Sequence, residues 1–247
     1  VRPNAGEEYV AECANYALAQ DVGGIPWVMC QQGEGTGTPP PAEIINACNG
    51  YYCDAWISAH AQDFPNQPHM FTENWPGWFQ KWGEAVPHRP ASDIAYSVAR
   101  WFARGGSYMN YYMAFGGSSF GREVGGPAII QSYDYDVQVN EYLLHNEPKF
   151  SLLSGLHTTL YEVADILFDD QPPPAVMISD ECESHTYFSS KDSSCVLFVS
   201  NYGTNGQCKF NEDIIEPWSV SIYRGTESSS KSCSNNLQML YGTKVGE

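Results

Sequence analysis

The sequence predicts an α/β fold in which parallel β/α units come first and a smaller antiparallel β region follows. Two observations indicate this order. Up to about residue 168, short apolar strand-like runs alternate with segments of helical periodicity, separated by short breaks. After Pro172–Pro174 the pattern changes to short alternating segments separated by Ser, Asn, Gly and Asp. We therefore expect two domains, 1–171 and 175–247, with the triple proline at the boundary.

The first part of the chain supplies the earliest β/α signals. Tyr9, Cys13 and Tyr16 recur at helical spacing, which predicts an amphipathic helix over 6–19. The apolar runs at 26–29 and 67–72 predict buried strands, and a Gly- and Pro-rich loop is expected over 33–41 between them.

The strongest helix signal covers residues 91–103, whose apolar residues share one face. Ser92 is the expected N-cap, and Gly105 with Gly106 is the expected stop. A strand over 107–113 then opens into a Gly-rich loop over 116–126, and another helix is expected over 152–168. In the antiparallel region, strands are expected at 186–188, 195–199 and 218–223.

Composition restricts the possible partners. The chain has 247 residues and a net charge of −17, so a polyanion would be repelled and no nucleic-acid partner is expected. No apolar run approaches the ~20 residues of a membrane helix, so no membrane partner is expected. No basic segment followed by an apolar one opens the chain, and no signal peptide is expected in it.

Eight cysteines in an acidic chain indicate an oxidising compartment and several disulfides. Eight cysteines allow about 105 full pairings, and the sequence does not choose among them. Zinc is the alternative for Cys48 and Cys53, but neither a second Cys-x-x-Cys nor a His pair accompanies them, so we expect no metal. No Asn-x-Ser/Thr acceptor occurs, so N-glycosylation is not expected.

The segment 69–79, His-Met-Phe-Thr-Glu-Asn-Trp-Pro-Gly-Trp-Phe, is the most informative part of the chain. It places one carboxylate, Glu73, between an apolar run and two tryptophans, Trp75 and Trp78, with a Pro-Gly turn between the indoles. Indole faces stack on the C–H face of a sugar, and a glycosidase would hold its nucleophile beside them. The residues alone equally allow a helix-capping or ion-paired Glu73 near packed aromatic side chains.

Residues 72–79 resemble the Thr-Glu-Asn-Trp-Thr-Gly-Trp-Phe motif of plant β-galactosidases, glycoside hydrolase family 35. Residues 25–32 and 46–54 resemble the family's Val-Pro-Trp-Ile-Met-Cys-Gln-Gln and Asn-Thr-Cys-Asn-Gly-Phe-Tyr-Cys-Asp segments. Further matches follow in the family's order within 89–102, 109–113, 132–136 and 146–149. The resemblance is specific from about Tyr9 to Lys149 and continues more weakly to about Gly246.

This resemblance implies a partial (β/α)₈ TIM barrel, its second half, followed by a small antiparallel β domain. The family's proton donor lies in an Asn-Glu-Tyr-Gly-Asn motif at the end of the fourth barrel strand, and this chain is expected to start just after that motif. An N-terminal fragment that completes the barrel is then the expected partner. A proteolytic product, or a half domain that is stable by itself, is the alternative.

The resemblance also implies site residues and a reaction. Glu73 is expected to be the nucleophile at the end of the seventh barrel strand. Glu7 and Glu8 are not expected to be the proton donor, because their setting is that of a helix start. No cofactor is expected. The residues expected to line a galactose pocket are Trp75, Trp78, Tyr112, Tyr133 and Tyr135.

The expected function is retaining cleavage of terminal β-galactosyl residues, with the proton donor outside this chain and a secreted, cell-wall or vacuolar location. The family's His-Gly-Gly-Thr-Asn-Phe-Gly-Arg is Phe-Gly-Gly-Ser-Ser-Phe-Gly-Arg over 115–122, and its Asp-Ala-Pro-Leu-Asp-Glu is Asp-Val-Gln-Val-Asn-Glu over 136–141. These departures favour the alternative, a non-catalytic galactose-binding protein or lectin. A storage or defence protein is a third hypothesis.

Overall fold

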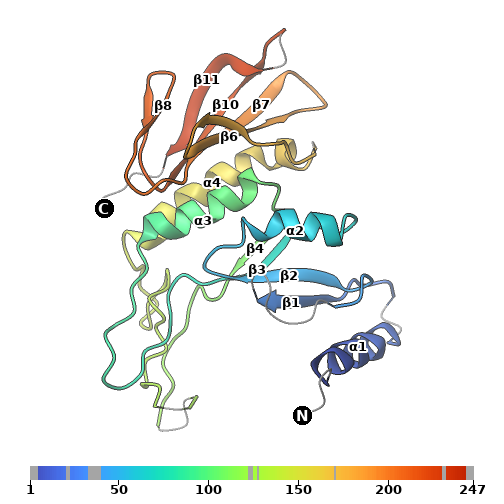
Figure 1. Ribbon diagram of the computed structural model, residues 1–247. Helices are drawn as coiled ribbons and strands as arrows, with labels where there is room; N and C mark the ends of the chain where they lie inside the picture. The colour runs from blue at the N-terminus through green and yellow to red at the C-terminus, as the bar shows by residue number, and fades with distance from the viewer. Residues whose placement is uncertain are drawn as a thin grey trace. The chain divides into compact units, whose positions relative to one another are not determined.

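A computed structural model describes residues 5–20, 23–32, 40–121, 125–126, 128–169, 171–229 and 232–242 (Figure 1). The fold combines helices, a parallel sheet and antiparallel sheets, so the predicted α/β class is confirmed. The chain forms two compact units, which we call unit 1 (Val1–Trp75 with Gly106–Tyr112) and unit 2 (Pro76–Gly105 with Met113–Glu247). The Gly-rich loops expected at 33–41 and 116–126 lie partly outside the described residues.

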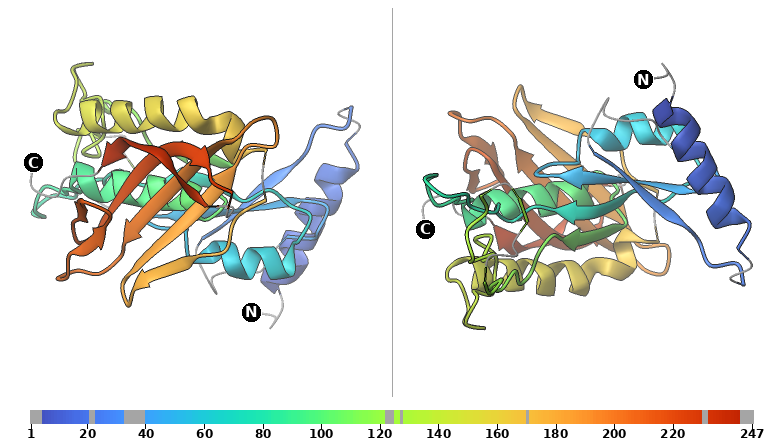
Figure 2. Two further views of the ribbon diagram at one scale, coloured as in Figure 1. Left: turned by 90° about the horizontal axis from the view of Figure 1, so that it is seen from above. Right: turned by 90° about the horizontal axis from the view of Figure 1, so that it is seen from below.

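Unit 1 contains a four-stranded parallel sheet in the order β1-β2-β3-β4, visible in Figure 2. Its strands are β1 (Val28–Gln32), β2 (Ile45–Gly50), β3 (Met70–Asn74) and β4 (Tyr108–Tyr111). No strand is predicted over β2, because Asn, Ala and Gly are poor strand formers, and burial between β1 and β3 overrides that preference. Because all four strands run parallel, their carboxyl ends lie along one edge of the sheet.

Two helices belong to unit 1. The predicted N-terminal helix is present as α1 (Ala5–Leu18), but the amphipathic face predicted for it is wrong: Tyr9, Cys13 and Tyr16 are exposed, and Ala14 is buried instead. The second helix, α2 (Trp56–Asp63), buries Trp56, Ile57 and His60. Among the described helices of the whole chain, none combines the length and apolarity that a membrane span requires.

A histidine pair joins α2 to the residue that precedes β3. His60 Nδ1 lies 2.8 Å from His69 Nδ1. Gln67 Nε2 donates to the carbonyl of Ile44 (2.9 Å), so Gln67 Oε1 accepts from the backbone N–H of Asn46 (2.8 Å) and from His60 Nε2 (3.3 Å). His60 therefore carries its proton on Nε2 and accepts at Nδ1 the proton of His69. Burial, together with the neighbouring His60, lowers the pKa of His69 to about 4.

Unit 2 contains a five-stranded antiparallel sheet in the order β11-β10-β7-β6-β5 and a two-stranded hairpin, β8–β9. Helices α3 (Ala91–Ala103) and α4 (Lys149–Leu167) cover one face of the five-stranded sheet (Figures 1 and 2). The strands are β5 (Val176–Ser179), β6 (Cys182–Phe188), β7 (Ser194–Asn201), β8 (Cys208–Phe210), β9 (Asp213–Ile215), β10 (Ser219–Glu227) and β11 (Cys233–Gly242).

Specific polar contacts hold α3 against the sheet. Tyr187 Oη donates to the carbonyl of Phe102 (3.0 Å) from β6. Trp218 Nε1 donates to Asp93 Oδ1 (2.6 Å), and the indole stacks on Tyr96 at 4.2 Å. Because the phenol and the indole would be costly to bury without partners, these bonds fix which face of α3 meets the sheet.

The range predicted for α3 is confirmed, but its predicted N-cap is wrong. Pro90 occupies the cap position with non-helical backbone angles (φ −56°, ψ 142°), and Ser92 lies inside the first turn. The helix ends at Ala103, and Gly105 follows with a φ of +99°, as expected for a stop signal. The strand predicted at 67–72 begins later, at Met70, so Glu73 lies within β3 rather than after it.

Six cysteines form three disulfides, Cys48–Cys53, Cys182–Cys208 and Cys195–Cys233, which confirms the expectation of several disulfides. Cys48 and Cys53 are bonded to each other, so they are not available as the zinc ligands considered above. Cys13 and Cys30 are free and exposed.

Candidate functional site

Glu73 lies at the carboxyl-end edge of the parallel sheet in unit 1. Backbone hydrogen bonds continue beyond the strand ends: the N–H of Trp75 donates to the carbonyl of Gly50 (3.1 Å), and the N–H of Tyr112 donates to the carbonyl of Asn74 (2.9 Å). Glu73, Trp75 and Tyr112 therefore lie along the same sheet edge, where parallel α/β folds place their ligands.

The Glu73 side chain is half-buried and is held by the neighbouring indole. Trp75 Nε1 donates to Glu73 Oε2 (3.0 Å), and the Trp75 ring meets the edge of the Tyr51 ring at 5.2 Å. Within the described residues Glu73 forms no ion pair and its Oε1 accepts no hydrogen bond, so the helix-capping and ion-paired alternatives are wrong. An indole donor stabilises the carboxylate without a neutralising cation and leaves one oxygen available.

Buried asparagines underlie this edge, and sequence reasoning did not select them. Asn49 stands opposite Glu73 in the strand register and accepts a hydrogen bond from the Thr72 hydroxyl at Oδ1 (2.6 Å). Asn49 and Asn74 are 3% and 0% exposed. Buried amides at strand ends are costly unless they are bonded, so asparagines within Cys-Asn-Gly and Glu-Asn-Trp are a usable signal.

Unit 2 brings together the other three predicted aromatic residues. Trp78 and Tyr133 both contact Tyr135, with ring centroids 5.7 Å and 5.6 Å from its ring. Phe79 extends this cluster by stacking on Tyr133 at 6.2 Å with nearly parallel planes. Tyr135 is buried, whereas Trp78 and Tyr133 are half-buried, so the cluster presents ring surface to solvent.

Two glycines allow the loops of this cluster to touch. A Cβ on Gly77 would lie 1.7 Å from the carbonyl oxygen of Tyr135, and a Cβ on Gly116 would lie 1.8 Å from that of Tyr133. Any side chain at either position would force the two backbones apart. The Pro-Gly turn predicted from sequence therefore serves close packing against the Tyr-Asp-Tyr segment.

A buried lysine supports the same loops. Lys149 Nζ donates to the carbonyl of Pro76 (3.1 Å), to Asp136 Oδ2 (2.8 Å) and to the Asp136 carbonyl. Burial lowers the pKa of Lys149, and the Asp136 carboxylate opposes that shift. The backbone N–H of Arg89 also donates to Asp136 Oδ2 (3.0 Å). Tyr135 and Asp136 both have positive φ (64° and 53°), a conformation that these contacts stabilise.

Comparison with known proteins identifies the family. The profile of glycosyl hydrolases family 35 matches residues 2–160. The chain belongs to this family. It is 46% identical over 228 residues to probable beta-galactosidase 2 of Dictyostelium discoideum, covering 90% of this chain and 28% of that protein. It is 39% identical over 222 residues to beta-galactosidase 6 of Oryza sativa subsp. japonica, covering 88% of this chain and 25% of that protein.

The chain thus spans about a quarter of the length of these relatives. Among solved structures, SrfJ from Salmonella typhimurium matches with a TM-score of 0.40 and 13% identity, over 75% of this chain and 42% of that one. A likeness this distant carries no argument about the fold or the function.

Both segments that depart from the family's motifs form local hydrogen bonds. Ser118, in the 115–122 loop, donates its hydroxyl to Glu141 Oε2 (2.8 Å), as does Ser132 (2.5 Å). These bonds lower the pKa of Glu141. Asn140, which stands where the family motif has aspartate, accepts at Oδ1 from the N–H groups of Tyr142 and Leu144 (both 3.0 Å). The amide oxygen thus closes the turn that a carboxylate could close.

The predicted site residues fall into two sets. Glu73, Trp75 and Tyr112 belong to unit 1, and Trp78, Tyr133 and Tyr135 belong to unit 2. Within the residues that the structure describes, no group of three or more His, Cys, Asp and Glu side chains could hold a metal ion.

Proposed function

We propose that this chain is part of a retaining β-galactosidase in which Glu73 is the nucleophile. The observation that carries the proposal is the placement of Glu73 at the carboxyl-end edge of a parallel sheet, bonded through one oxygen to Trp75. Barrel enzymes keep catalytic residues at such strand ends, and the chain belongs to a family of glycosyl hydrolases.

In the proposed reaction, Glu73 Oε1 attacks the anomeric carbon of a terminal β-galactosyl residue. The bond to the leaving oxygen breaks as that oxygen takes a proton from a general acid, and a galactosyl ester of Glu73 forms. Water, deprotonated by the same acid/base group, then hydrolyses the ester. The second carboxyl group would lie about 5–5.5 Å from Glu73. We assign it to a polypeptide segment outside this chain.

The remaining predicted residues would bind the sugar. Trp75 and Trp78 would stack on its C–H face, and the hydroxyls of Tyr112, Tyr133 and Tyr135 would bond to its hydroxyls. We also propose that residues 1–171 form the second half of a (β/α)₈ barrel, completed by an N-terminal fragment, and that 175–247 form an antiparallel β domain against which α3 and α4 pack. The three disulfides support an oxidising compartment such as the cell exterior, cell wall or vacuole.

We favour the hydrolase over the galactose-binding lectin. Both relatives are named as β-galactosidases, and no contact described above favours binding without cleavage.

The test is a Glu73→Gln variant of the complete protein assayed with nitrophenyl β-galactoside. We expect kcat to fall more than about 10³-fold, as for other nucleophile deletions, with little change in galactose affinity. Glu162→Gln, on the exposed side of α4, is the matched control. A 2-deoxy-2-fluoro-galactoside should label the unmodified protein on Glu73, as read by peptide mass. A label on another carboxylate, or full activity of Glu73→Gln, would refute the assignment.

A further inference from the structure

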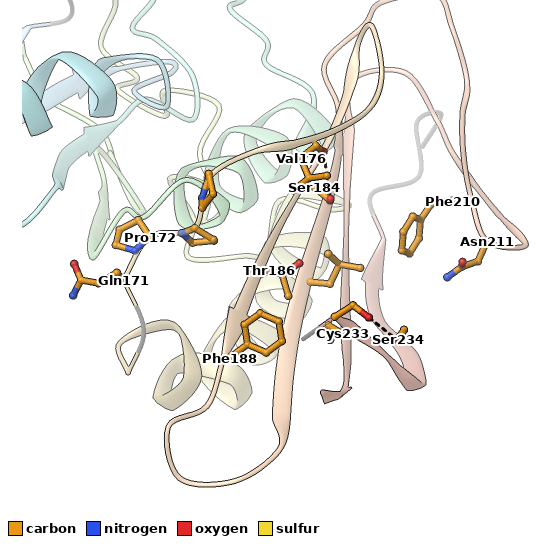
Figure 3. A pocket seen from close by; sticks show the side chains of 14 residues that line it. Gln171, Pro172, Val176, Ser184, Thr186, Phe188, Phe210, Asn211, Cys233 and Ser234 are labelled. Carbon is orange, nitrogen blue, oxygen red and sulfur yellow. Dashed lines mark hydrogen bonds between the residues drawn. The ribbon is translucent and has the colours of Figure 1, made fainter. Parts of the chain in front are cut away.

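A groove of about 750 Å³ opens on the five-stranded sheet of unit 2 (Figure 3). Alternate residues of a strand face opposite sides of a sheet. Tyr187 of β6 points toward α3, so Thr186 and Phe188 belong to the face away from the helices. The groove is lined by Gln171, Pro172, Pro173, Pro174, Val176, Ser184, Thr186, Phe188, Leu197, Phe210, Asn211, Ser232, Cys233 and Ser234.

Covalent links fix the walls of this groove. Cys182–Cys208 ties β6 to the hairpin that carries Phe210 and Asn211, and Cys195–Cys233 ties β7 to β11. Asn211 occupies the first position of the two-residue turn between β8 and β9, with a φ of 52°. A cavity whose walls are held this way loses little conformational freedom when a ligand enters it.

The lining is uncharged although the whole chain carries a net charge of −17. Ring and C–H surfaces come from Phe188, Phe210 and the triple proline, which Figure 3 shows around the central Thr186. Within the described residues, the Thr186 hydroxyl and the Asn211 amide make no hydrogen bond. Both groups can donate and accept, which matches the hydroxyl groups of a sugar.

The floor of the groove offers an extended peptide only a short sheet edge. Such peptides bind by adding a strand to a free sheet edge. The floor strand β6 pairs with β7 along its whole length and with β5 over residues 182–184, so only residues 185–188 lie outside the ladder to β5. A ligand would therefore be held mainly by side-chain hydroxyls, amides and apolar surfaces.

We propose that this groove binds a neutral oligosaccharide. Its volume falls within the range of about 300–1,000 Å³ found for small-molecule sites, which leaves room for a short chain of sugars rather than one. That the sugars are β-galactosyl units rests on the proposed function. In that case the β domain holds a galactan chain whose end is cleaved elsewhere in the protein.

The test is retardation of the complete protein in native gels that contain neutral β-galactan, in a Glu73→Gln background that prevents degradation. Asn211→Gly removes the amide while keeping the positive φ, and Asn236→Gly (φ 51°, exposed, outside the groove) is the matched control. We expect retardation to weaken at least about fivefold for Asn211→Gly and to stay unchanged for Asn236→Gly. Thr186→Val should act like Asn211→Gly, with Thr158→Val on α4 as its control.

Equal retardation of Asn211→Gly and Asn236→Gly, or no retardation of either, would overturn the proposal. So would retardation that a proline-rich peptide abolishes while galacto-oligosaccharides do not, since the groove would then be a peptide site. Polygalacturonate, a polyanion, should cause no retardation. Hydrolysis of nitrophenyl galactoside by the protein with Glu73 intact tests the proposed function separately. If that hydrolysis is absent, the retardation of Asn211→Gly and Asn236→Gly can still differ, and the groove proposal then stands without the enzymatic one.

Discussion

The hydrogen bond from Trp75 Nε1 to Glu73 Oε2 (3.0 Å) gives the indole a role in addition to the sugar stacking that we propose for it. Hydrogen bonds to a charged group contribute about 1.5–3 kcal/mol, enough to hold the carboxylate in one orientation. Trp75 follows Glu73 by two positions, directly after the end of β3, so the sequence predicts that they lie near one another but not that they are bonded.

We predict that Trp75→Phe lowers kcat/KM about 10- to 100-fold, because it keeps a ring but removes the donor to the proposed nucleophile. The value of kcat/KM is read from nitrophenyl galactoside kinetics. Trp82→Phe, at an indole that is 76% exposed, should leave kcat/KM unchanged. An unchanged kcat/KM for Trp75→Phe would show that the bond has no catalytic role.

Gly77, in the turn after Trp75, lies in close contact with the backbone of Tyr135. We predict that Gly77→Ala destabilises unit 2 by more than about 2 kcal/mol, because the added Cβ would lie 1.7 Å from the Tyr135 carbonyl oxygen. Gly155→Ala is the control: it lies in α4 with no atom within 4 Å, so it should stabilise by about 0.5–1 kcal/mol. Urea unfolding followed by tryptophan fluorescence measures both. Equal stability of the two variants would contradict the close approach.

At the scale of elements, helical periodicity predicted the existence of α1 and α3 but the wrong buried face of α1, whereas β2 and α2 could not be predicted. The β2 segment Ile-Asn-Ala-Cys-Asn-Gly has no alternating pattern, because both of its faces are buried. The prediction of Ser92 as the N-cap of α3 is wrong for a local reason. Pro90 has a fixed φ that suits the start of a helix, so the serine two positions later is not needed as the cap.

The contact between α2 and the start of β3 predicts a pH dependence. His69 has a folded pKa of about 4, below its ordinary value of 6.5, so folding favours the neutral ring. This stability is fully present above about pH 6.5 and is lost as the pH falls toward 4. The neighbouring His60, whose pKa burial also lowers, accepts a proton from His69 and cannot do so once it is charged.

We therefore expect the urea midpoint of the native protein to fall between pH 7 and pH 5, and to fall less in His69→Asn. The asparagine keeps a donor near His60 but does not titrate. His145→Asn, at an exposed histidine, should keep the native pH dependence. An identical fall of the urea midpoint in the native protein and in both variants would show that the His60–His69 pair does not contribute to the pH dependence of stability.

At the scale of the whole molecule, the parallel sheet of unit 1 has unpaired edges at β1 and β4 within the described residues. If an N-terminal fragment completes a barrel, it must pair with one or both of these edges. We predict that adding this fragment slows hydrogen exchange at the backbone amides of Val28–Gln32 by about tenfold or more and restores lactose hydrolysis. Amides of β7, paired on both sides, serve as the internal control. Unchanged exchange at β1 and β4 would argue against barrel completion.

The family motifs in the sequence select six candidate site residues, but they do not predict how these residues divide between the two units. Trp75 and Pro76 are neighbours in the chain but belong to different units, as do Tyr112 and Met113. Periodicity predicts which face of a helix or strand is buried, but it does not predict against which unit that face packs. The supports at Lys149 and Gly77 are likewise long-range contacts that no local pattern shows.

The three passages of the chain between the two units also set an order of events during synthesis. As the chain leaves the ribosome, β1, β2 and β3 emerge in turn, and β4 arrives only after residues 75–107, which include all of α3. At about 5–20 residues per second the delay between β3 and β4 is a few seconds, during which the β4 side of β3 is an open edge. The sheet of unit 1 is therefore completed only after a whole helix of unit 2 has been synthesised.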